Sequence, residues 1–356
     1  MKTVNRRILE RLGTTILTFL VSFSVLLAPA TAHAANDSGA FNLITSPLPI
    51  SLSGPPGSTL TTDIRLKNGG TTTEHLKVNL MKFSANGDEG KPTIADRATG
   101  DDYFDWVTFS PSTFEAPPNE WETIKMTINL PKTAAFGYYY AAAFSRDGKQ
   151  PTPNKTTVLF GSAAVLVLVE AKVPNAKREA NILSLTSSKK TYEFLPAIFS
   201  IKIHNGGNVH LIQSGDLVIK KNKKEISRLH INTAQGNILP NSNRIFTASW
   251  NDGYPYYSEK VLNGATVLDK NGKPVSSLSW NTDKISHLRI GKYTASLLMV
   301  YDDGSKDVPM EATVSFWVIP WRLFGLAFLI LAIPAGAVYV VMRRRIKGLR
   351  KVTKRV

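Results

Sequence analysis

Short runs of alternating apolar and polar positions recur along this chain, separated by turn residues. The clearest run is Trp121–Leu130, in which Ile124, Met126 and Ile128 share one face. Alternation of this kind predicts strands with one buried face. A near-continuous apolar run at residues 163–169 instead predicts a strand that is buried on both faces. Short strands punctuated by turns are typical of β-sandwich proteins.

Three short motifs occur twice in the same order: an apolar strand ending in Asn-Gly-Gly, a Pro-Asn turn, and a Gly-x-Tyr-x-Ala strand. The first copies begin at Ile64, Pro118 and Gly137, and the second copies begin at Ile201, Pro240 and Gly291. The Gly pairs suit turns that need a positive φ. We therefore predict an all-β fold of two tandem immunoglobulin-like β-sandwich domains, residues 35–172 and 180–318, joined by a linker at residues 173–179. Chance matching of common turn residues is the alternative.

The N-terminal 34 residues have the order of a secretory signal peptide. A basic start is followed by the apolar run Ile16–Leu27 and by the small-x-small triplet Ala32-His33-Ala34. The apolar run is short for a spanning helix of about 20 residues. We expect cleavage after Ala34, with an uncleaved anchor as the alternative.

The C-terminal end has the pattern of a membrane anchor. Residues 323–342 are apolar apart from two glycines and Pro334, and residues 343–356 hold eight basic residues and no acid. Basic residues beside a spanning segment stay in the cytoplasm. We predict one transmembrane helix at 323–342 in the lipid bilayer, a cytoplasmic tail at 343–356, and extracellular modules on the cell membrane.

The net charge of +16 does not indicate a nucleic-acid-binding protein. The tail contributes +8 and the first 34 residues contribute +3, which leaves +5 for the rest of the chain. We expect no nucleic-acid partner. The chain has no cysteine, so an exported form must fold without disulfides, and thiol catalysis and thiolate metal sites are excluded.

No catalytic motif occurs in the sequence. There is no G-x-S-x-G, Walker loop or H-E-x-x-H, and the six histidines lack metal-ligand spacing. We therefore expect a protein that is not an enzyme and needs no cofactor. Catalytic groups can come together from distant loops, so an enzyme remains an alternative.

Two groups of residues are candidates for recognition. Tyr254, Tyr256 and Tyr257 lie in an aromatic, turn-rich segment, and such rings suit sugars or a protein partner, although local packing explains them equally well. Asp101 and Asp102 belong to an acidic stretch that offers hard oxygen ligands for calcium. Solvation of an ordinary surface loop is the alternative for these acids.

Two polar segments, residues 84–105 and 147–154, are predicted to be surface loops of the first domain. The second domain joins the membrane segment almost without a spacer, so the first domain is expected to face outward. Loops on a rigid sheet are free to carry recognition. We therefore expect wall binding, if it occurs, in these two loops.

The order of signal, two modules, spanning helix and basic tail resembles the WxL-interacting proteins of bacterial cell surfaces. The first-module pattern at residues 64–68, 121–131 and 136–140 is similar to the first domain of that family, and residues 239–243 are similar to its second. The resemblance implies a peptidoglycan-binding domain followed by a domain that binds host or partner proteins. It specifies no binding residue, and the stretch 251–290 departs from the repeat.

The sequence thus predicts a non-catalytic surface protein that binds cell-wall polymer (peptidoglycan), another surface protein, or both. One alternative is an envelope glycan-acting enzyme with carboxylates drawn from separate loops. The other is a structural accessory subunit of a membrane complex.

Overall fold

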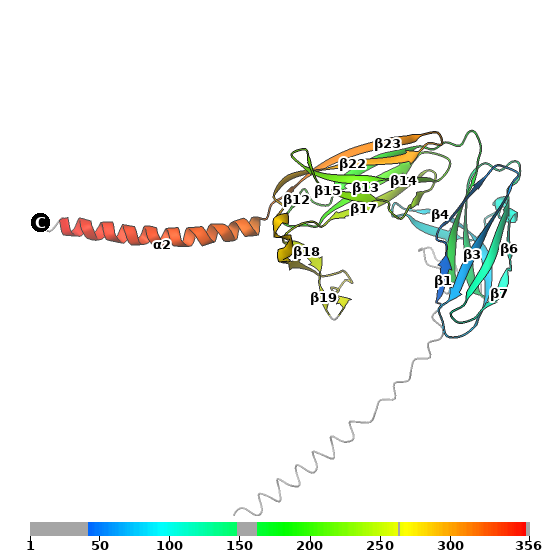
Figure 1. The fold of residues 1–356 in the computed structure, drawn as a ribbon, viewed down its shortest axis with the longest axis horizontal. Helices are drawn as coiled ribbons and strands as arrows, with labels where there is room; N and C mark the ends of the chain where they lie inside the picture. The colour runs from blue at the N-terminus through cyan, green and yellow to red at the C-terminus, as the bar shows by residue number, and fades with distance from the viewer. Residues whose placement is uncertain (1–41, 148–161, 263, 354–356) are drawn as a thin grey trace, which may run out of the picture.

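The computed structural model describes residues 42–147, 162–262 and 264–353 (Figure 1). The predicted signal segment, residues 1–34, and most of the predicted loop at 147–154 lie outside these residues. Two β-rich modules, module 1 (residues 43–171) and module 2 (residues 180–318), are followed by one long helix. The predicted all-β fold of two immunoglobulin-like sandwiches is confirmed.

Module 1 is built from two sheets. The first has the strand order β1-β3-β8-β6, and the second has the order β2-β10-β9-β4-β5, with β7 also paired to β4. The strands β2 and β10 run parallel. The strand bounds are β1 Leu43–Ser46, β2 Ile50–Gly54, β3 Thr59–Asn68, β4 Glu74–Asn86, β5 Lys91–Ala95, β6 Val107–Ser110, β7 Thr113–Ala116, β8 Trp121–Asn129, β9 Phe136–Arg146 and β10 Ser162–Ala171, and a 3-10 helix, η1, covers Asp102–Trp106.

Module 2 repeats this arrangement. Its first sheet has the order β11-β13-β17, and its second has the order β12-β23-β22-β14-β15, with β16 also paired to β14 and with β12 parallel to β23. The bounds are β11 Ala180–Ser187, β12 Thr191–Tyr192, β13 Ala197–Asn205, β14 Leu211–Lys221, β15 Lys224–Ile231, β16 Asn237–Ile238, β17 Ser242–Trp250, β22 Gly291–Asp302 and β23 Asp307–Val318. The repeated motifs therefore lie on equivalent strands. Gly137 is the second residue of β9, and Gly291 is the first residue of β22.

Asn68, at the end of β3, shows why the repeated motif needs an asparagine. Its Nδ2 donates to the carbonyl oxygens of Thr72 (2.7 Å) and Ala116 (2.8 Å). Its Oδ1 accepts from the backbone N–H of Gly70 at 2.8 Å. One buried side chain thus ties the end of β3 to its own turn and to β7.

Asn205, at the end of β13, makes the same three bonds in module 2. Its Nδ2 donates to the carbonyl oxygens of Val209 (2.8 Å) and Ile238 (2.9 Å). Its Oδ1 accepts from the backbone N–H of Gly207 at 2.8 Å. The two asparagines thus make matching bonds at equivalent strand ends, which supports the predicted repeat.

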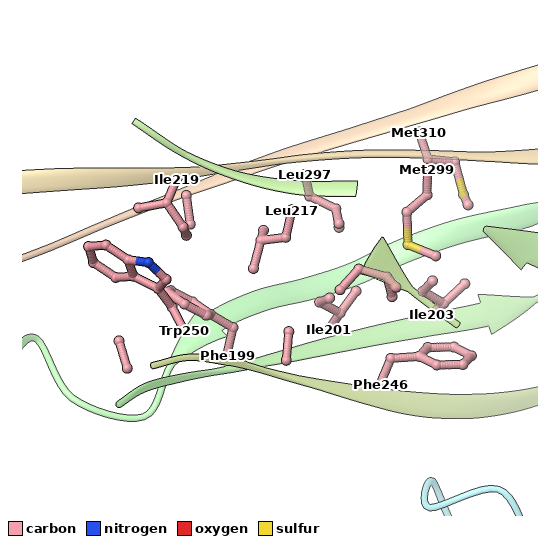
Figure 2. Packing of buried hydrophobic residues seen from close by; sticks show 14 of the residues in the cluster. Phe199, Ile201, Ile203, Leu217, Ile219, Phe246, Trp250, Leu297, Met299 and Met310 are labelled. Carbon is pink, nitrogen blue, oxygen red and sulfur yellow. The ribbon is translucent and has the colours of Figure 1, made fainter. Parts of the chain in front are cut away.

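Each module has its own apolar core. Figure 2 shows the core of module 2, where Phe199 and Trp250 belong to one buried cluster and Ile201 faces Leu217. In module 1 the equivalent strands contribute Ile64, Leu66 and other alternating residues. Burial of such residues is the main favourable term in folding.

Strand β10 is buried on both faces, as its apolar run predicted. Val167 belongs to the core of module 1, whereas Leu168 belongs to a second cluster on the outer face of the same sheet. Leu239 of module 2 packs against that outer cluster. Docking of module 2 therefore explains why this strand needs apolar residues on both sides.

Residues 84–105 do not form the continuous surface loop that the sequence predicted. The strands β4 and β5 form a hairpin within this segment, and η1 follows. The polar residues belong to a hairpin whose turn contacts module 2. The hairpin strands are too short here for alternation of apolar and polar residues to predict them.

The stretch 251–290 forms a small insertion in module 2. The strands β18 (Tyr256–Glu259) and β21 (Ser276–Ser279) pair, as do β19 (Val261–Leu262) and β20 (Ala265–Thr266), and the 3-10 helix η2 (Thr282–His287) follows. Figure 1 shows the insertion projecting from module 2 near the start of the long helix.

The helix α2 spans Trp321–Thr353 and begins three residues after β23 ends. The part Trp321–Arg344 is long and apolar enough to cross a membrane, and none of it is buried against the modules. The helix is longer than the predicted segment 323–342 because Lys and Arg are good helix formers and continue it.

We predict that Asn205→Ala and Asn68→Ala each lower the free energy of unfolding by about 3 kcal/mol, because each leaves buried backbone groups without a partner. Asn→Asp at either position should lower the free energy of unfolding by at least as much, since a carboxylate would face two carbonyl oxygens. The measurement is denaturant unfolding of the full chain in detergent. Asn271→Ala, on an exposed turn, is the control and should change little; equal losses at all three positions would contradict this role.

Candidate functional site

A pocket of about 640 Å³ lies between the two modules. Its walls are mostly apolar and come from the outer face of the β10-β9-β4-β5 sheet, from the β1–β2 connection, and from the segment around β16. The apolar lining residues include Leu48, Pro49, Phe83, Ile94, Ala164, Leu166, Leu168, Ile238 and Leu239. Ser84, Asn237, Ser242, Asn243, Lys91 and Arg244 supply the polar groups.

The turn between β4 and β5 holds the modules together beside this pocket. The backbone N–H of Ile245 on β17 donates to the carbonyl oxygen of Asp88 at 2.6 Å. The Asp88 carboxylate accepts from the Lys202 ammonium on β13. The Lys202 ammonium and then the Asn243 amide lower the pKa of Asp88, so this carboxylate is ionised at neutral pH.

The linker between the modules is also fixed to both. The Arg178 guanidinium pairs with the buried carboxylate of Glu170 at the end of β10. The backbone N–H of Lys177 donates to Asn208 Oδ1 at 2.7 Å, and the Lys177 carbonyl accepts from the Asn208 N–H at 3.0 Å. These contacts oppose the hinge motion that a short basic linker would otherwise permit.

Arg244 is one of two charged residues that line the pocket. It lies on β17 between Gly90 of module 1 and Gly236 of module 2, where an added Cβ would come within 2.6 Å of Nε and 2.5 Å of Nη2, respectively. Its Nη1 donates to the carbonyl oxygen of Asn237 at 2.7 Å, and its guanidinium lies 5.3 Å from the centroid of the Phe246 ring. Burial lowers its pKa.

Arg244 lacks the carboxylate partner that other part-buried arginines have. In the described part of the chain, Arg146, Arg178 and Arg289 pair with Glu74, Glu170 and Asp252. No carboxylate in that part pairs with Arg244. A sequence signal existed, since Arg244 precedes the core residue Phe246 by two positions on one strand and so shares its inward face. Arg244 was not among the residues predicted from the sequence.

The pocket contains no acid–base pair of the kind that hydrolysis requires. None of the described residues that line it is an aspartate, glutamate or histidine. Lys91, the other cation there, pairs with Glu89 at 2.7 Å. The Oδ1 of Asn237 is buried and accepts no hydrogen bond in the described structure. Among the polar groups of the described lining, Arg244 is thus the cation without an acid, and Asn237 Oδ1 is a buried acceptor without a donor.

The predicted tyrosines are placed away from this pocket, in the insertion. Tyr254 makes an edge contact with Trp280 (6.0 Å between ring centroids), and Tyr257 packs on Phe194 at 6.1 Å. The Lys284 ammonium lies 5.4 Å from the Tyr256 centroid. All three side chains are half-buried. Two of these contacts are internal to the insertion, and the Tyr257–Phe194 contact joins it to the rest of module 2.

The predicted acidic residues Asp101 and Asp102 point to different surroundings. The Asp101 carboxylate is buried, pairs with Lys82 at 2.8 Å, and has a pKa lowered first by that ammonium and then by the Ala98 N–H. The side chain of Asp102 is 88% exposed. Across the described ranges, no group of three His, Cys, Asp or Glu residues could hold a metal ion. The structure does not bring the two aspartates together as a calcium site.

Asp252, His287 and Arg289 form a cluster that the sequence analysis missed. Asp252 accepts from Arg289 Nη2 at 2.5 Å and contacts His287 Nδ1, while Arg289 Nε donates to the Asp252 carbonyl at 2.9 Å. The three residues lie near the two ends of the insertion in the sequence, and their contacts hold these ends together.

No protein-family model matches this chain, and no curated protein matches it. Solved structures that are similar include the class 5 fimbriae chaperone CfaA, the E. coli chaperone DraB and the Pseudomonas aeruginosa CupB2 chaperone. CfaA is 18% identical and covers 67% of this chain and 100% of its own, with a TM-score of 0.32. DraB is 10% identical (76% and 96% covered) and CupB2 is 9% identical (77% and 100% covered), both with TM-scores of 0.32.

At these identities and scores the likeness carries no inference about what the chain binds. The sheet topology and the pocket define the class of protein: an all-β chain of two immunoglobulin-like sandwiches, docked around an apolar pocket and followed by one candidate membrane span.

We predict that acidification weakens the contact between the modules through His210. Its ring makes an edge contact with Tyr139 of module 1 at 5.8 Å, its Nδ1 is buried without a partner, and burial lowers its pKa below 6.5. The nearby Glu170 opposes this shift, and Arg178 reinforces it. A lowered pKa means that its contribution to stability is complete above pH 6.5 and is lost as the pH falls through the pKa of the folded state.

The measurement is the melting temperature of the full chain at pH 7.5 and at pH 5.5. His210→Phe should reduce the drop between the two values, whereas Asn271→Ala, on an exposed turn, should leave it unchanged. If the melting temperature of His210→Phe falls between pH 7.5 and pH 5.5 as much as that of the natural chain, His210 does not cause the loss of stability.

Proposed function

We propose that this chain is a non-catalytic binding protein, held at the cell surface by α2, whose ligand enters the pocket between the modules. In keeping with the resemblance to WxL-interacting proteins, we propose a partner among surface proteins, with peptidoglycan as the second candidate ligand. The observation that carries the proposal is the pocket itself, which has apolar walls and an unpaired guanidinium.

Binding is favoured over catalysis because of how the acids are placed. A glycan hydrolase needs two carboxyl groups facing each other across a cleft, at about 5–9.5 Å depending on mechanism. The described pocket lining supplies no carboxylate, and several of the part-buried acids, such as Glu74, Asp101 and Glu170, are paired with cations. Pairing of this kind holds structure rather than supplying a proton.

Surface proteins are favoured over wall polymer because of the character of the pocket. Apolar side chains form most of its lining, whereas sugars need many convergent hydrogen-bond groups. An aromatic platform that could stack on a sugar ring is not present there, since Phe83 is the sole aromatic side chain among the described lining residues.

The proposed membrane placement follows from α2. The segment Trp321–Arg344 is long and apolar enough to cross a membrane and starts directly after module 2. With the basic residues after it in the cytoplasm, the modules lie outside. A purely structural role as an accessory subunit is the remaining alternative, and it predicts that the pocket is dispensable.

We predict that filling the pocket abolishes capture of a partner by the full chain in detergent. Ala164→Phe places a ring in the pocket wall, and capture of a surface protein or sedimentation with peptidoglycan should fall at least tenfold. Ala265→Phe, on the exposed strand β20, is the matched control and should capture normally.

The two arms of this experiment identify the ligand. Loss of protein capture supports the leading proposal, and loss of sedimentation with peptidoglycan supports the second. Full capture by Ala164→Phe in both arms would overturn the pocket as the site and favour a structural subunit.

The membrane topology can be tested with single cysteines, because the natural chain has none. We predict that a membrane-impermeant maleimide labels Thr71→Cys in intact cells. Thr353→Cys should be labelled only after the cells are permeabilised. The reverse pattern would place the modules inside the cell and contradict the proposed orientation.

A further inference from the structure

We propose that the pocket between the modules binds an N-acyl amino acid end, with Arg244 pairing with its carboxylate and Asn237 accepting its N–H. This inference rests on the proposed function and names the chemistry of the ligand at that same site. The apolar walls hold the side chain beside the carboxylate.

The arrangement of donors on Arg244 indicates a carboxylate. Nη1 already donates to the Asn237 carbonyl at 2.7 Å, while Nε and Nη2 have no hydrogen-bond partner among the described residues. Two parallel N–H groups on one edge of a guanidinium match the two oxygens of a carboxylate. A part-buried cation without a partner is costly, and a bound anion would compensate it.

The charge count favours a monoanion. Arg244 is the one cation of the described lining without an acid, because the Lys91 ammonium pairs with Glu89. A carboxylate carries one negative charge and balances it. A phosphate monoester carries nearly two at neutral pH and would leave charge uncompensated in an apolar pocket.

The free acceptor on Asn237 specifies a donor next to the carboxylate. Its Oδ1 is buried and unpaired, and its own carbonyl oxygen already binds Arg244. A ligand that pairs with Arg244 therefore places its neighbouring atoms close to Asn237. An amide N–H one bond from the carboxyl-bearing carbon satisfies this acceptor, whereas a plain fatty acid does not.

The walls and the size of the pocket select an apolar ligand longer than one amino acid. Leu166 and Leu168 from β10 and Leu239 from module 2 line it, and its volume of about 640 Å³ falls in the range of about 300–1,000 Å³ typical of small-molecule sites. Two or three apolar residues ending in a free carboxylate fit this space.

The test is calorimetric titration of the full chain in lipid nanodiscs with the N-acetylated tripeptide Val-Ile-Leu. The free acid should bind about ten- to a hundredfold more tightly than the amide, since the amide lacks the charge that Arg244 meets. Octanoate, which has the carboxylate but no N–H, should bind at least tenfold more weakly than the free acid.

Arg244→Gln should remove the preference for acid over amide, whereas Arg65→Gln should keep it. Arg65 is a matched control because it also lies over an aromatic ring, Trp121, without an ion pair. It belongs to the β1-β3-β8-β6 sheet of module 1, which does not line the pocket. If Arg244→Gln is unstable, Ala164→Phe serves in its place and should abolish binding of acid and amide alike.

Equal binding of acid and amide by the natural chain would overturn this inference, as would tighter binding of inorganic phosphate than of the tripeptide. Neither result would contradict the proposed function, which fails only when Ala164→Phe captures its macromolecular partner normally.

Discussion

The turn at residues 87–90 of module 1 contacts two strands of module 2, and this contact helps to hold the two modules together. Asp88 offers its backbone carbonyl to Ile245 and its carboxylate to Lys202. The turn thereby accepts a backbone hydrogen bond from the edge strand β17, and it places the Asp88 carboxylate beside the Lys202 ammonium on β13. Together with the Glu170–Arg178 pair at the linker, it converts two similar sandwiches into a docked pair.

Docking explains features that neither module would need by itself. The outer face of the β10-β9-β4-β5 sheet would face water in an isolated sandwich, yet it carries Met81, Phe83 and Leu168 in a buried cluster. The same face continues into the wall of the pocket. Arg244, flanked by a glycine from each module, lies where the modules meet. The site is therefore a property of the pair.

The fold was predictable from the sequence to the extent that local pattern encodes it. Alternation located the main strands, and the repeated Asn-Gly-Gly predicted equivalent strand ends, because Asn68 and Asn205 make the same three bonds. The apolar run in β10 predicted burial on two faces. The hairpin in residues 84–105 was missed because its polar residues contact another module, and such contacts leave no periodic signal.

The candidate site was less predictable than the fold. The sequence indicated tyrosine-rich and acidic segments as recognition candidates; in the structure Tyr254 contacts Trp280 and Asp101 pairs with Lys82, and their role in recognition stays a prediction. The group that distinguishes the pocket is a single arginine, Arg244, on an otherwise ordinary strand. Its importance comes from what is missing around it, a carboxylate, and a missing partner can be recognised only in three dimensions.

The central claim, that the two modules form one docked unit around the pocket, is tested most directly by electron-spin distance measurement on the full chain. Spin labels at Thr123→Cys on β8 and Thr313→Cys on β23 would report the separation of the modules, since the natural chain has no cysteine. The account predicts one narrow distance distribution, which broadens when Asp88→Ala removes the link to Lys202. A broad distribution in the otherwise natural chain would contradict it.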